Sequence, residues 1–189
     1  MSEGLNSYIF DFSRKSTREF FHKMIVTEIG FIYKSGYRIV TACKDNKVLG
    51  VALLKDNRRV ALAKRIRLLL QRIPVLTQIL LKVRLRRAIS VMKAIAAPES
   101  IKGNYTTLFA LAVHPDFQNM GIGKMLLSKI HQENETDLTS CGTYLFTIDE
   151  KNRLLYQRVG YRTVETKRGG ELTIYHMFRN NFTDKLVKQ

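Results

Sequence analysis

The chain is poor in cysteine, has no tryptophan and lacks any long apolar run. Its 189 residues include two cysteines, Cys43 and Cys141, which form neither a CxxC pair nor a disulfide framework. We therefore expect two reduced thiols, and no metal site. No apolar stretch approaches about 18 residues, and residues 1–16 are too polar for a signal peptide. The sequence predicts a soluble, cytoplasmic protein without a membrane span.

Acidic residues are scarce relative to basic ones. Sixteen Asp and Glu stand against 32 Lys and Arg, which gives a formal net charge of +16. This balance favours an anionic partner, and composition alone leaves open nucleic acid, a membrane surface and a phosphorylated small molecule. The length suffices for one domain with a full core. No repeat, low-complexity tract or Gly/Ser linker divides the chain.

Hydrophobic periodicity predicts a mixed α/β layout. A capping box at Ser16 and Glu19 begins a helix that we expect to end at Gly36. Two β-rich runs around Asp45 and Asn46 predict a hairpin. After residue 98 the pattern predicts strands at 105–113, 142–148, 161–167 and 171–178, helices at about 121–132 and 150–159, and a turn at 168–170.

Residues 57–98 differ from the rest of the chain. They have helical periodicity and no glycine, and twelve Lys and Arg lie between Lys55 and Lys93 against Asp56 alone. Basic amphipathic helices of this kind can lie on a membrane or on nucleic acid. We favour the alternative that the apolar residues, Ile89 among them, pack on the domain while the cations are solvated. The apolar positions are too numerous to remain exposed.

The stretch LFALAVHPDFQNMGIGKMLLSKI, residues 108–130, predicts a strand, a glycine turn and a helix. This arrangement is the usual one for holding phosphate oxygens on free backbone N–H groups. A P-loop is excluded, because it needs glycine at Gln118 and Ser or Thr at Met125. A dinucleotide-binding fingerprint is also excluded, since its third glycine would fall on Leu126.

What remains is a Q-x-x-G-x-G pattern formed by Gln118, Gly121 and Gly123. Here the sequence resembles the GNAT N-acetyltransferase superfamily, in which [QR]-x-x-G-x-[GA] wraps the pyrophosphate of acetyl-CoA. Glycine is expected at both Gly121 and Gly123, because a side chain at either position would stand between the backbone and the phosphates.

A second pattern follows in the superfamily's usual order. Asn152, Tyr156, Gly160 and Tyr161 form N-x-x-x-Y-x-x-x-G-[FY] behind a predicted strand. Each residue alone has an ordinary structural explanation, such as a helix stop at Gly160. Their joint occurrence behind the first pattern is what favours the resemblance.

The resemblance implies an α/β GNAT fold, with a mixed, mostly antiparallel central sheet flanked by helices and a basic helical insertion at about 57–98. The whole chain, 1–189, would be a single N-acetyltransferase domain. Within the superfamily it looks nearest the puromycin N-acetyltransferase-like group, which carries a similar insertion. The implied activity is direct transfer of acetyl from acetyl-CoA to a primary amine of an unidentified small molecule or peptide, without a metal.

The resemblance also implies the residues of the site. Tyr156 matches the general acid, and a backbone N–H within 111–113 would stabilise the oxyanion. Lys124 and Lys129 are candidate cations for the phosphates of CoA. The residues expected to bind the cofactor are Leu111, Ala112, Val113, Gln118, Asn119, Met120, Gly121, Ile122, Gly123, Lys124 and Asn152.

Two departures from the family pattern bear on catalysis. The chain looks shortened before Ser16, and Phe146 stands where the puromycin-like group has a carboxylate. His114, Glu28 and Asp149 are candidate general bases, but none matches a family position. The alternative is therefore a CoA-binding regulatory or interaction module with weak or no catalysis, with a nucleic-acid or anionic-membrane surface. Monomer and homodimer both stay open, since a lost edge strand would invite pairing between chains.

Overall fold

The computed structural model describes residues 8, 13, 15, 16, 18, 19, 37–56 and 85–181. The elements are, in chain order, β1 (Arg38–Lys44), β2 (Lys47–Asp56), α5 (Leu85–Ile95), β3 (Thr106–Val113), η1 (Pro115–Phe117), α6 (Ile122–Thr136), β4 (Gly142–Thr147), α7 (Glu150–Arg158), β5 (Arg162–Gly169) and β6 (Leu172–Asn180). Residues 20–36 of the predicted first helix and residues 57–84 of the predicted insertion lie outside the described residues.

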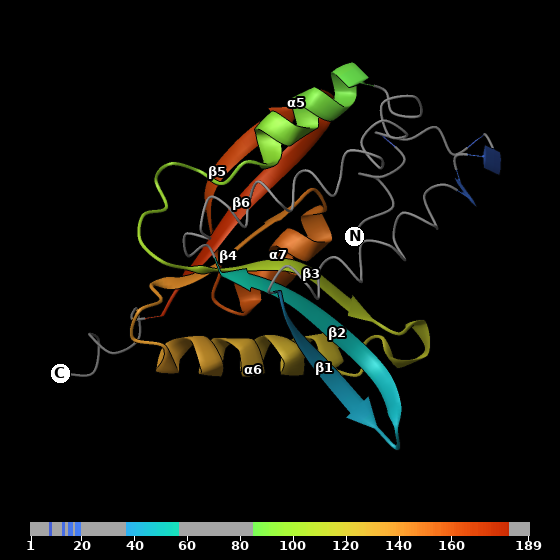
Figure 1. Cartoon of the computed structure of the whole chain (residues 1–189), viewed down its shortest axis with the longest axis vertical. Helices are drawn as coiled ribbons and strands as arrows, with labels where there is room; N and C mark the ends of the chain where they lie inside the picture. The colour runs from blue at the N-terminus through green and yellow to red at the C-terminus, as the bar shows by residue number, and fades with distance from the viewer. Residues whose placement is uncertain are drawn as a thin grey trace, which may run out of the picture.

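The strands form one six-stranded sheet in the order β1-β2-β3-β4-β6-β5. All neighbouring pairs are antiparallel except β3 and β4, which are parallel. Helix α6 runs along β1, β2 and β3, while α5 runs along β5 and β6 (Figure 1). The predicted α/β class, with a mixed and mostly antiparallel sheet flanked by helices, is confirmed.

The two hairpin turns have different chemistry. Asp45 and Asn46 both have positive φ, 48° and 62°, as a two-residue turn between twisted strands requires. The predicted first hairpin is therefore confirmed. The turn predicted at 168–170 is shifted, because Gly169 still pairs with Leu172 in the β5–β6 ladder and Gly170, with φ 69°, begins the turn.

Gly169 is explained by helix packing rather than by a turn. A Cβ on it would lie 3.2 Å from both Ala94 Cβ and Val91 Cα, so a side chain there would require α5 to move by a few tenths of an ångström. Val91 and Ala94 are buried on this face. The prediction that the insertion packs on the domain is thus confirmed for α5, but it was wrong for Ile89, which is 45% exposed.

His176 on β6 fixes the same helix from within the sheet. Its Nε2 lies 2.8 Å from the carbonyl oxygen of Ala94, and its Nδ1 lies 2.7 Å from the hydroxyl of Tyr144. A carbonyl can only accept, so Nε2 carries the hydrogen and Nδ1 accepts from Tyr144. Burial lowers the pKa of His176, which favours this neutral form.

The core lies between the sheet and α6. Its buried members are Ala52, Leu54, Leu108, Leu127, Ile130, Leu145, Tyr161 and Met177. Helix α6 approaches β2 closely at Gly50, where a Cβ would lie 3.1 Å from side-chain atoms of Ile122 and Leu126. This close approach sets the direction in which α6 leaves the end of β3.

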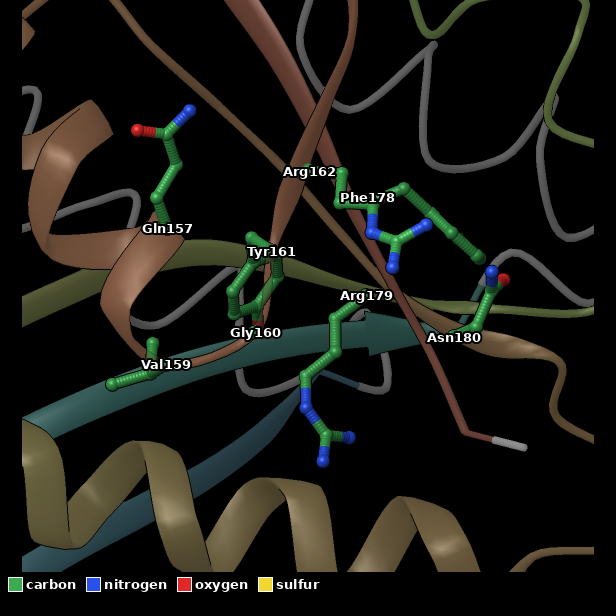
Figure 2. Close-up of a pocket in the computed structure, with 8 residues that line it drawn as sticks. All are labelled: Gln157, Val159, Gly160, Tyr161, Arg162, Phe178, Arg179 and Asn180. Carbon is green, nitrogen blue, oxygen red and sulfur yellow. The ribbon is translucent and has the colours of Figure 1, made fainter. Parts of the chain in front are cut away.

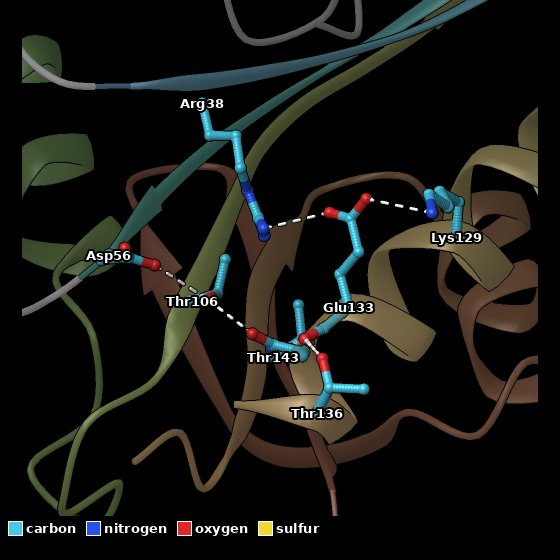
Figure 3. A network of polar contacts seen from close by, with 8 residues as sticks. Arg38, Asp56, Thr106, Lys129, Glu133, Thr136 and Thr143 are labelled. Carbon is cyan, nitrogen blue, oxygen red and sulfur yellow. Dashed lines mark hydrogen bonds and ion pairs between the residues drawn. The ribbon is translucent and has the colours of Figure 1, made fainter. Parts of the chain in front are cut away.

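Polar contacts hold the other end of α6 (Figure 3). Glu133 pairs with Arg38 of β1 at 3.0 Å and with Lys129 at 3.4 Å. Buried Asn134 donates to the carbonyl oxygen of Gly142 and to the Thr143 hydroxyl. The helix therefore continues four residues past its predicted end at 132, because these residues bond to the sheet.

Candidate functional site

Strands β3 and β4 separate along their length. Their parallel ladder consists of two residue pairs, Thr106 with Thr143 and Thr107 with Tyr144, although the strands continue to Val113 and Thr147. Backbone N–H groups alternate between the two edges of a strand. The N–H groups between residues 108 and 113 that do not face β2 therefore face the opening.

A β-bulge shapes the β3 side of this opening. The register with β2 shifts between Leu53 and Leu54, whose partners are Ala110 and Leu108, so Phe109 is the extra residue. An extra residue breaks the alternation of faces. Leu108 and Leu111, three positions apart, consequently both reach the core cluster, and Phe109 is left 46% exposed.

The turn after β3 is built by local hydrogen bonds. The Gln118 side-chain amide donates to the carbonyl oxygen of Val113 at 3.3 Å, which closes the turn back on the strand. Asn119 and Gly121 both have positive φ, 62° and 80°, and Gly121 is the N-cap of α6. A Cβ on Gly121 would meet nothing within 4 Å, so the backbone conformation, not crowding, favours glycine there.

The first turn of α6 presents unpaired donors. The N–H groups of Ile122, Gly123 and Lys124 precede the first intrahelical bond, which runs from Met125 N to Gly121 O at 2.9 Å. The N-cap makes no side-chain bond to them. Gly123 sits beside β3, where a Cβ would lie 3.7 Å from Val113 and 4.0 Å from Leu111. Free N–H groups and the helix dipole together favour an anion at this end.

A cleft of about 540 Å³ lies between this turn and α7. Its charged lining residues are Lys124 and Arg158, both positive. The described residues that line it are Leu111, Val113, Phe117, Gln118, Asn119, Gly121, Ile122, Gly123, Lys124, Leu127, Asn152, Leu155, Tyr156, Arg158 and Val159. Of the predicted cofactor residues, Ala112 and Met120 are the ones not in this lining.

One face of α7 forms the far wall. Asn152, Leu155, Tyr156 and Val159 have the i, i+3, i+4, i+7 spacing of a helix face. Asn152 and Tyr156 were predicted from the sequence, whereas Leu155, Val159 and the nearby Arg158 were not. The same helical spacing, extended from Tyr156, was the signal that would have found Leu155 and Val159.

Tyr156 lies where two cavities meet. It lines the larger cleft and also a second hollow of about 250 Å³, together with Leu111 and Asn152. Its ring packs edge-on against Tyr161, with centroids 5.6 Å apart. Burial raises the pKa of Tyr156, and among the described residues its hydroxyl has no hydrogen-bond partner. The phenol therefore stays protonated at neutral pH and is free to bond a ligand.

The described lining of the second hollow is mostly apolar. Phe146 of β4 and Phe109 of β3 stand in its walls, on opposite sides of the opening. The described residues that line it are Ile95, Leu108, Phe109, Ala110, Leu111, Leu145, Phe146, Thr147, Ile148, Asn152 and Tyr156. Among these residues none is a carboxylate, a cation or a histidine.

The candidate bases have other roles where the structure describes them. Asp149 is the N-cap of α7 and accepts from Lys151 N at 2.7 Å and from Asn152 N at 3.1 Å. His114 caps η1 by accepting from Asp116 N at 3.3 Å, and neither residue lines a cavity described above. Glu28 lies outside the described residues.

Other predicted residues are placed away from the cleft. Lys129 pairs with Glu133, so it is engaged at the β1 side of α6. Gly160, with φ 94°, ends α7, and Tyr161 is buried with its hydroxyl 3.1 Å from His131 Nε2. The second sequence pattern therefore divides, because its first two residues line the cleft, whereas Gly160 ends α7 and Tyr161 belongs to the core.

A third hollow, of about 380 Å³, lies between the end of α7 and strands β5 and β6 (Figure 2). Arg179 and Arg162 extend from its walls, and Arg179 bonds Glu135 of α6 at 2.7 Å. Gly160 opens this space, since a Cβ there would lie 3.3 Å from Arg179 Nε. Because Tyr156 and the α6 N-terminus are absent from its lining, we do not take it for the reaction site.

The described residues bear on three further expectations. No described helix is long and apolar enough to cross a membrane. The described residues also contain no group of three or more His, Cys, Asp or Glu side chains arranged to hold a metal ion. Both cysteines are free thiols, as predicted.

The parted parallel strands and the helix N-terminus beside them define the GNAT fold. Residues 88–163 match the family model for the acetyltransferase (GNAT) domain, a family that transfers acetyl groups from acetyl-CoA. The match spans both sequence patterns and the two walls of the cleft. No curated protein sequence matches the chain.

Solved structures give the same fold over most of the chain. A histone acetyltransferase HPA2 and related acetyltransferase from Corynebacterium glutamicum is 15% identical with a TM-score of 0.58, covering 92% of this chain and 79% of that one. A mutant AtaT toxin bound to the C-terminus of the antitoxin AtaR and acetyl-CoA is also 15% identical, with a TM-score of 0.52 and coverage of 95% and 89%. At this identity the likeness supports the fold alone.

Proposed function

We propose that the chain is an N-acetyltransferase of the GNAT family that moves an acetyl group from acetyl-CoA to a primary amine. One observation carries the proposal: Tyr156 stands where a cleft ending at a helix N-terminus meets an apolar hollow. A donor in the cleft and an acceptor in the hollow would meet at this phenol. The proposal treats residues 1–189 as a single domain.

The diphosphate of CoA would bind at the first turn of α6. We assign it to the backbone of Asn119 through Lys124, with Gln118 holding the turn in shape. Lys124 and Arg158 supply the positive charge that a diphosphate prefers. Met120 is 67% exposed, and we assign only its backbone.

The pantetheine chain would lie in the opening between β3 and β4. Backbone groups of Leu111, Ala112 and Val113 would bond its amides there and place a donor at the thioester oxygen. The Asn152 amide, which lines both cavities, would hold the chain from the α7 side. Among the described residues these strands have no pairing partner in the opening, so the cofactor would bond their free backbone groups.

The reaction balances with the groups present. The amine lone pair forms the N–C bond to the thioester carbon, and the C–S bond breaks to give a thiolate. Tyr156 donates its proton to the sulfur as that bond breaks. The nitrogen of the new amide must lose one proton. This proton can pass to the Tyr156 phenolate directly or through water.

Isothermal titration calorimetry with acetyl-CoA and with CoA tests the donor assignment. We expect binding at tens of micromolar or tighter. Absence of binding in that range would show that the cleft does not hold CoA. An Arg162→Glu variant, altered in the hollow of Figure 2, is the matched control for an Arg158→Glu variant in the cleft.

Phe146 favours a second candidate function, a CoA-binding module with weak or no catalysis. It replaces an expected carboxylate, and the described hollow contains no other. The two candidates separate in a thiol-release screen over amines. A chain that binds acetyl-CoA, releases no thiol with any amine and is unaffected by Tyr156→Phe is the module.

A further inference from the structure

Helix α5 has two faces of different character. Its inner face packs beside β5 and β6 (Figure 1), where Val91 and Ala94 are buried and Gly169 permits the close approach. On the side that faces away from the sheet, Ile89 is 45% exposed and Met92 is 67% exposed. Single exposed apolar residues are ordinary. These two are three positions apart, so they share one helix surface and form an apolar strip.

Cations lie beside this apolar strip. Arg86 and Lys93 are exposed on the same outward side of the helix. We call the surface made by Arg86, Ile89, Met92 and Lys93 the outer face of α5. The helix contains three basic residues and no acidic one, and it belongs to the stretch in which twelve Lys and Arg stand against Asp56. The outer face is therefore both apolar and positively charged.

A hollow of about 370 Å³ adjoins the outer face at Lys93. The described residues that line it are Ser90, Lys93, Ala94, Lys167 and Arg168. Lys167 is already engaged, because its Nζ lies 3.4 Å from Glu165 and donates to the carbonyl oxygen of Ala96 at 3.2 Å. Among the described residues, Lys93 and Arg168 have no ion-pair partner. The hollow therefore offers two free cations to an anionic group such as a phosphate.

The apolar strip favours a lipid bilayer over nucleic acid as the partner. Cations alone would not distinguish the two, since both are polyanions. Nucleic acid is bound through its phosphates, its base edges and aromatic stacking, so exposed aliphatic side chains gain little from it. The boundary between headgroups and acyl chains of an anionic bilayer accommodates both kinds of group. Aliphatic side chains enter it while the flanking cations contact lipid phosphates.

From this arrangement we propose that the outer face of α5 docks on the surface of an anionic phospholipid bilayer. The helix would lie parallel to the surface, with Ile89 and Met92 below the headgroups and with Lys93 and Arg168 at lipid phosphates. This binding surface goes beyond the proposed function and does not depend on acetyl transfer. Because Ile95 of the same helix lines the second hollow, docking would hold the reaction site close to the bilayer.

A single tryptophan tests whether the outer face enters the bilayer. The chain has no tryptophan, so the fluorescence of a Met92→Trp variant reports one position alone. We expect its emission to shift to the blue, and to be quenched by brominated acyl chains, on phosphatidylcholine vesicles that contain phosphatidylglycerol. Vesicles of phosphatidylcholine alone should give neither effect. Leu138→Trp, at a position 85% exposed in the α6–β4 connection, is the matched control and should not shift on either vesicle.

Cosedimentation with the same anionic vesicles separates the apolar and the electrostatic contributions. We expect Ile89→Asn combined with Met92→Gln to weaken binding by at least about tenfold, and the control Leu138→Gln by less than about twofold. Lys93→Glu combined with Arg168→Glu should weaken binding by at least about 25-fold, because each cation near such a surface contributes about fivefold.

The charge control carries the same change in net charge at the other edge of the described sheet. Lys44 and Lys47 are exposed beside the β1–β2 turn, whereas α5 contacts β5 and β6. We expect Lys44→Glu combined with Lys47→Glu to weaken vesicle binding by less than about threefold. Equal losses in the two charge-reversal variants would show that net charge acts alone and would overturn the assignment to α5.

Three other outcomes would also overturn the proposal. They are absence of binding to anionic vesicles at low ionic strength, vesicle binding without a blue shift of Met92→Trp, and tighter binding of duplex DNA or of RNA than of vesicles. The last result would assign the basic surface to nucleic acid. Acetyl-CoA binding, measured by calorimetry, should be the same in every variant, so failure of the docking surface and failure of the proposed function are distinguishable.

Discussion

Removing the Tyr156 hydroxyl should lower turnover without lowering stability. Its ring packs on Tyr161 with centroids 5.6 Å apart, and phenylalanine keeps that contact. Among the described residues the hydroxyl bonds to nothing, so its loss leaves no buried group unpaired there. We expect the free energy of unfolding of Tyr156→Phe to stay within about 0.5 kcal/mol of the parent.

The expected loss of turnover follows from the acid strength of the phenol. General acid catalysis contributes about 10²–10⁴ in rate. A phenol of pKa about 10 is a weaker acid than a CoA-type thiol of pKa about 8.5, and burial raises the pKa of Tyr156 further. Complete proton transfer before the C–S bond breaks is therefore unfavourable. We expect the low end, a fall in kcat of about 100-fold, or about 2.7 kcal/mol in the activation barrier.

The assay is thiol release with saturating acetyl-CoA and the best acceptor from the amine screen, together with urea unfolding. Tyr161→Phe is the matched control, because its hydroxyl lies 3.1 Å from His131 Nε2 and outside the cleft. That variant should lose about 1 kcal/mol of stability and keep kcat within about twofold. A folded Tyr156→Phe enzyme with kcat within threefold of the parent would refute the acid role.

Three further perturbations test the site and the core. Gly121→Ala forces a side chain onto a φ of 80° and should cost about 1–2 kcal/mol in urea unfolding, whereas Gly123→Ala should cost less; equal losses would contradict the conformational explanation. Arg158→Glu should weaken acetyl-CoA binding at least tenfold by calorimetry, and Arg162→Glu by less than twofold; equal effects would indicate net charge alone. Burial lowers the pKa of His131 to about 4 from 6.5, so the native state binds fewer protons than the unfolded chain. The contribution of His131 to stability is then fully present above pH 6.5, and about 3 kcal/mol of it is lost as the pH falls from 6.5 to 4. Thermal melts of the parent and of His131→Gln should diverge over that range of pH. Parallel curves would show that His131 does not cause the loss of stability in acid.

The fold could be predicted in large part because its local signals agree. Asp45 and Asn46 between two β-rich runs specify one turn, and the glycine turn before α6 has a spacing that few phosphate sites share. Gly169 shows where this reasoning fails. The local sequence predicts that Gly169 belongs to a turn. The structure instead explains this glycine by the close approach of Val91 and Ala94, which lie on a helix more than seventy residues earlier. No local sequence pattern contains that contact.

The candidate site could be predicted where one helix or one turn carries it. Asn152 and Tyr156 lie on a single face of α7, so their spacing already placed them together. Phe109 could not be assigned in the same way, because the bulge that exposes it depends on the register between β2 and β3. The apolar hollow likewise depends on the separation of two strands, and therefore on their whole environment.

One residue can serve two proton steps of the proposed reaction. Burial raises the pKa of Tyr156 and keeps the phenol protonated at neutral pH, so the proposed acid is available when sulfur departs. In the proposed reaction the amine attacks in its neutral form, because only the neutral form has a free lone pair. It gives up its proton afterwards to the phenolate formed when sulfur departs, so the proposed acid also acts as the base that completes the transfer.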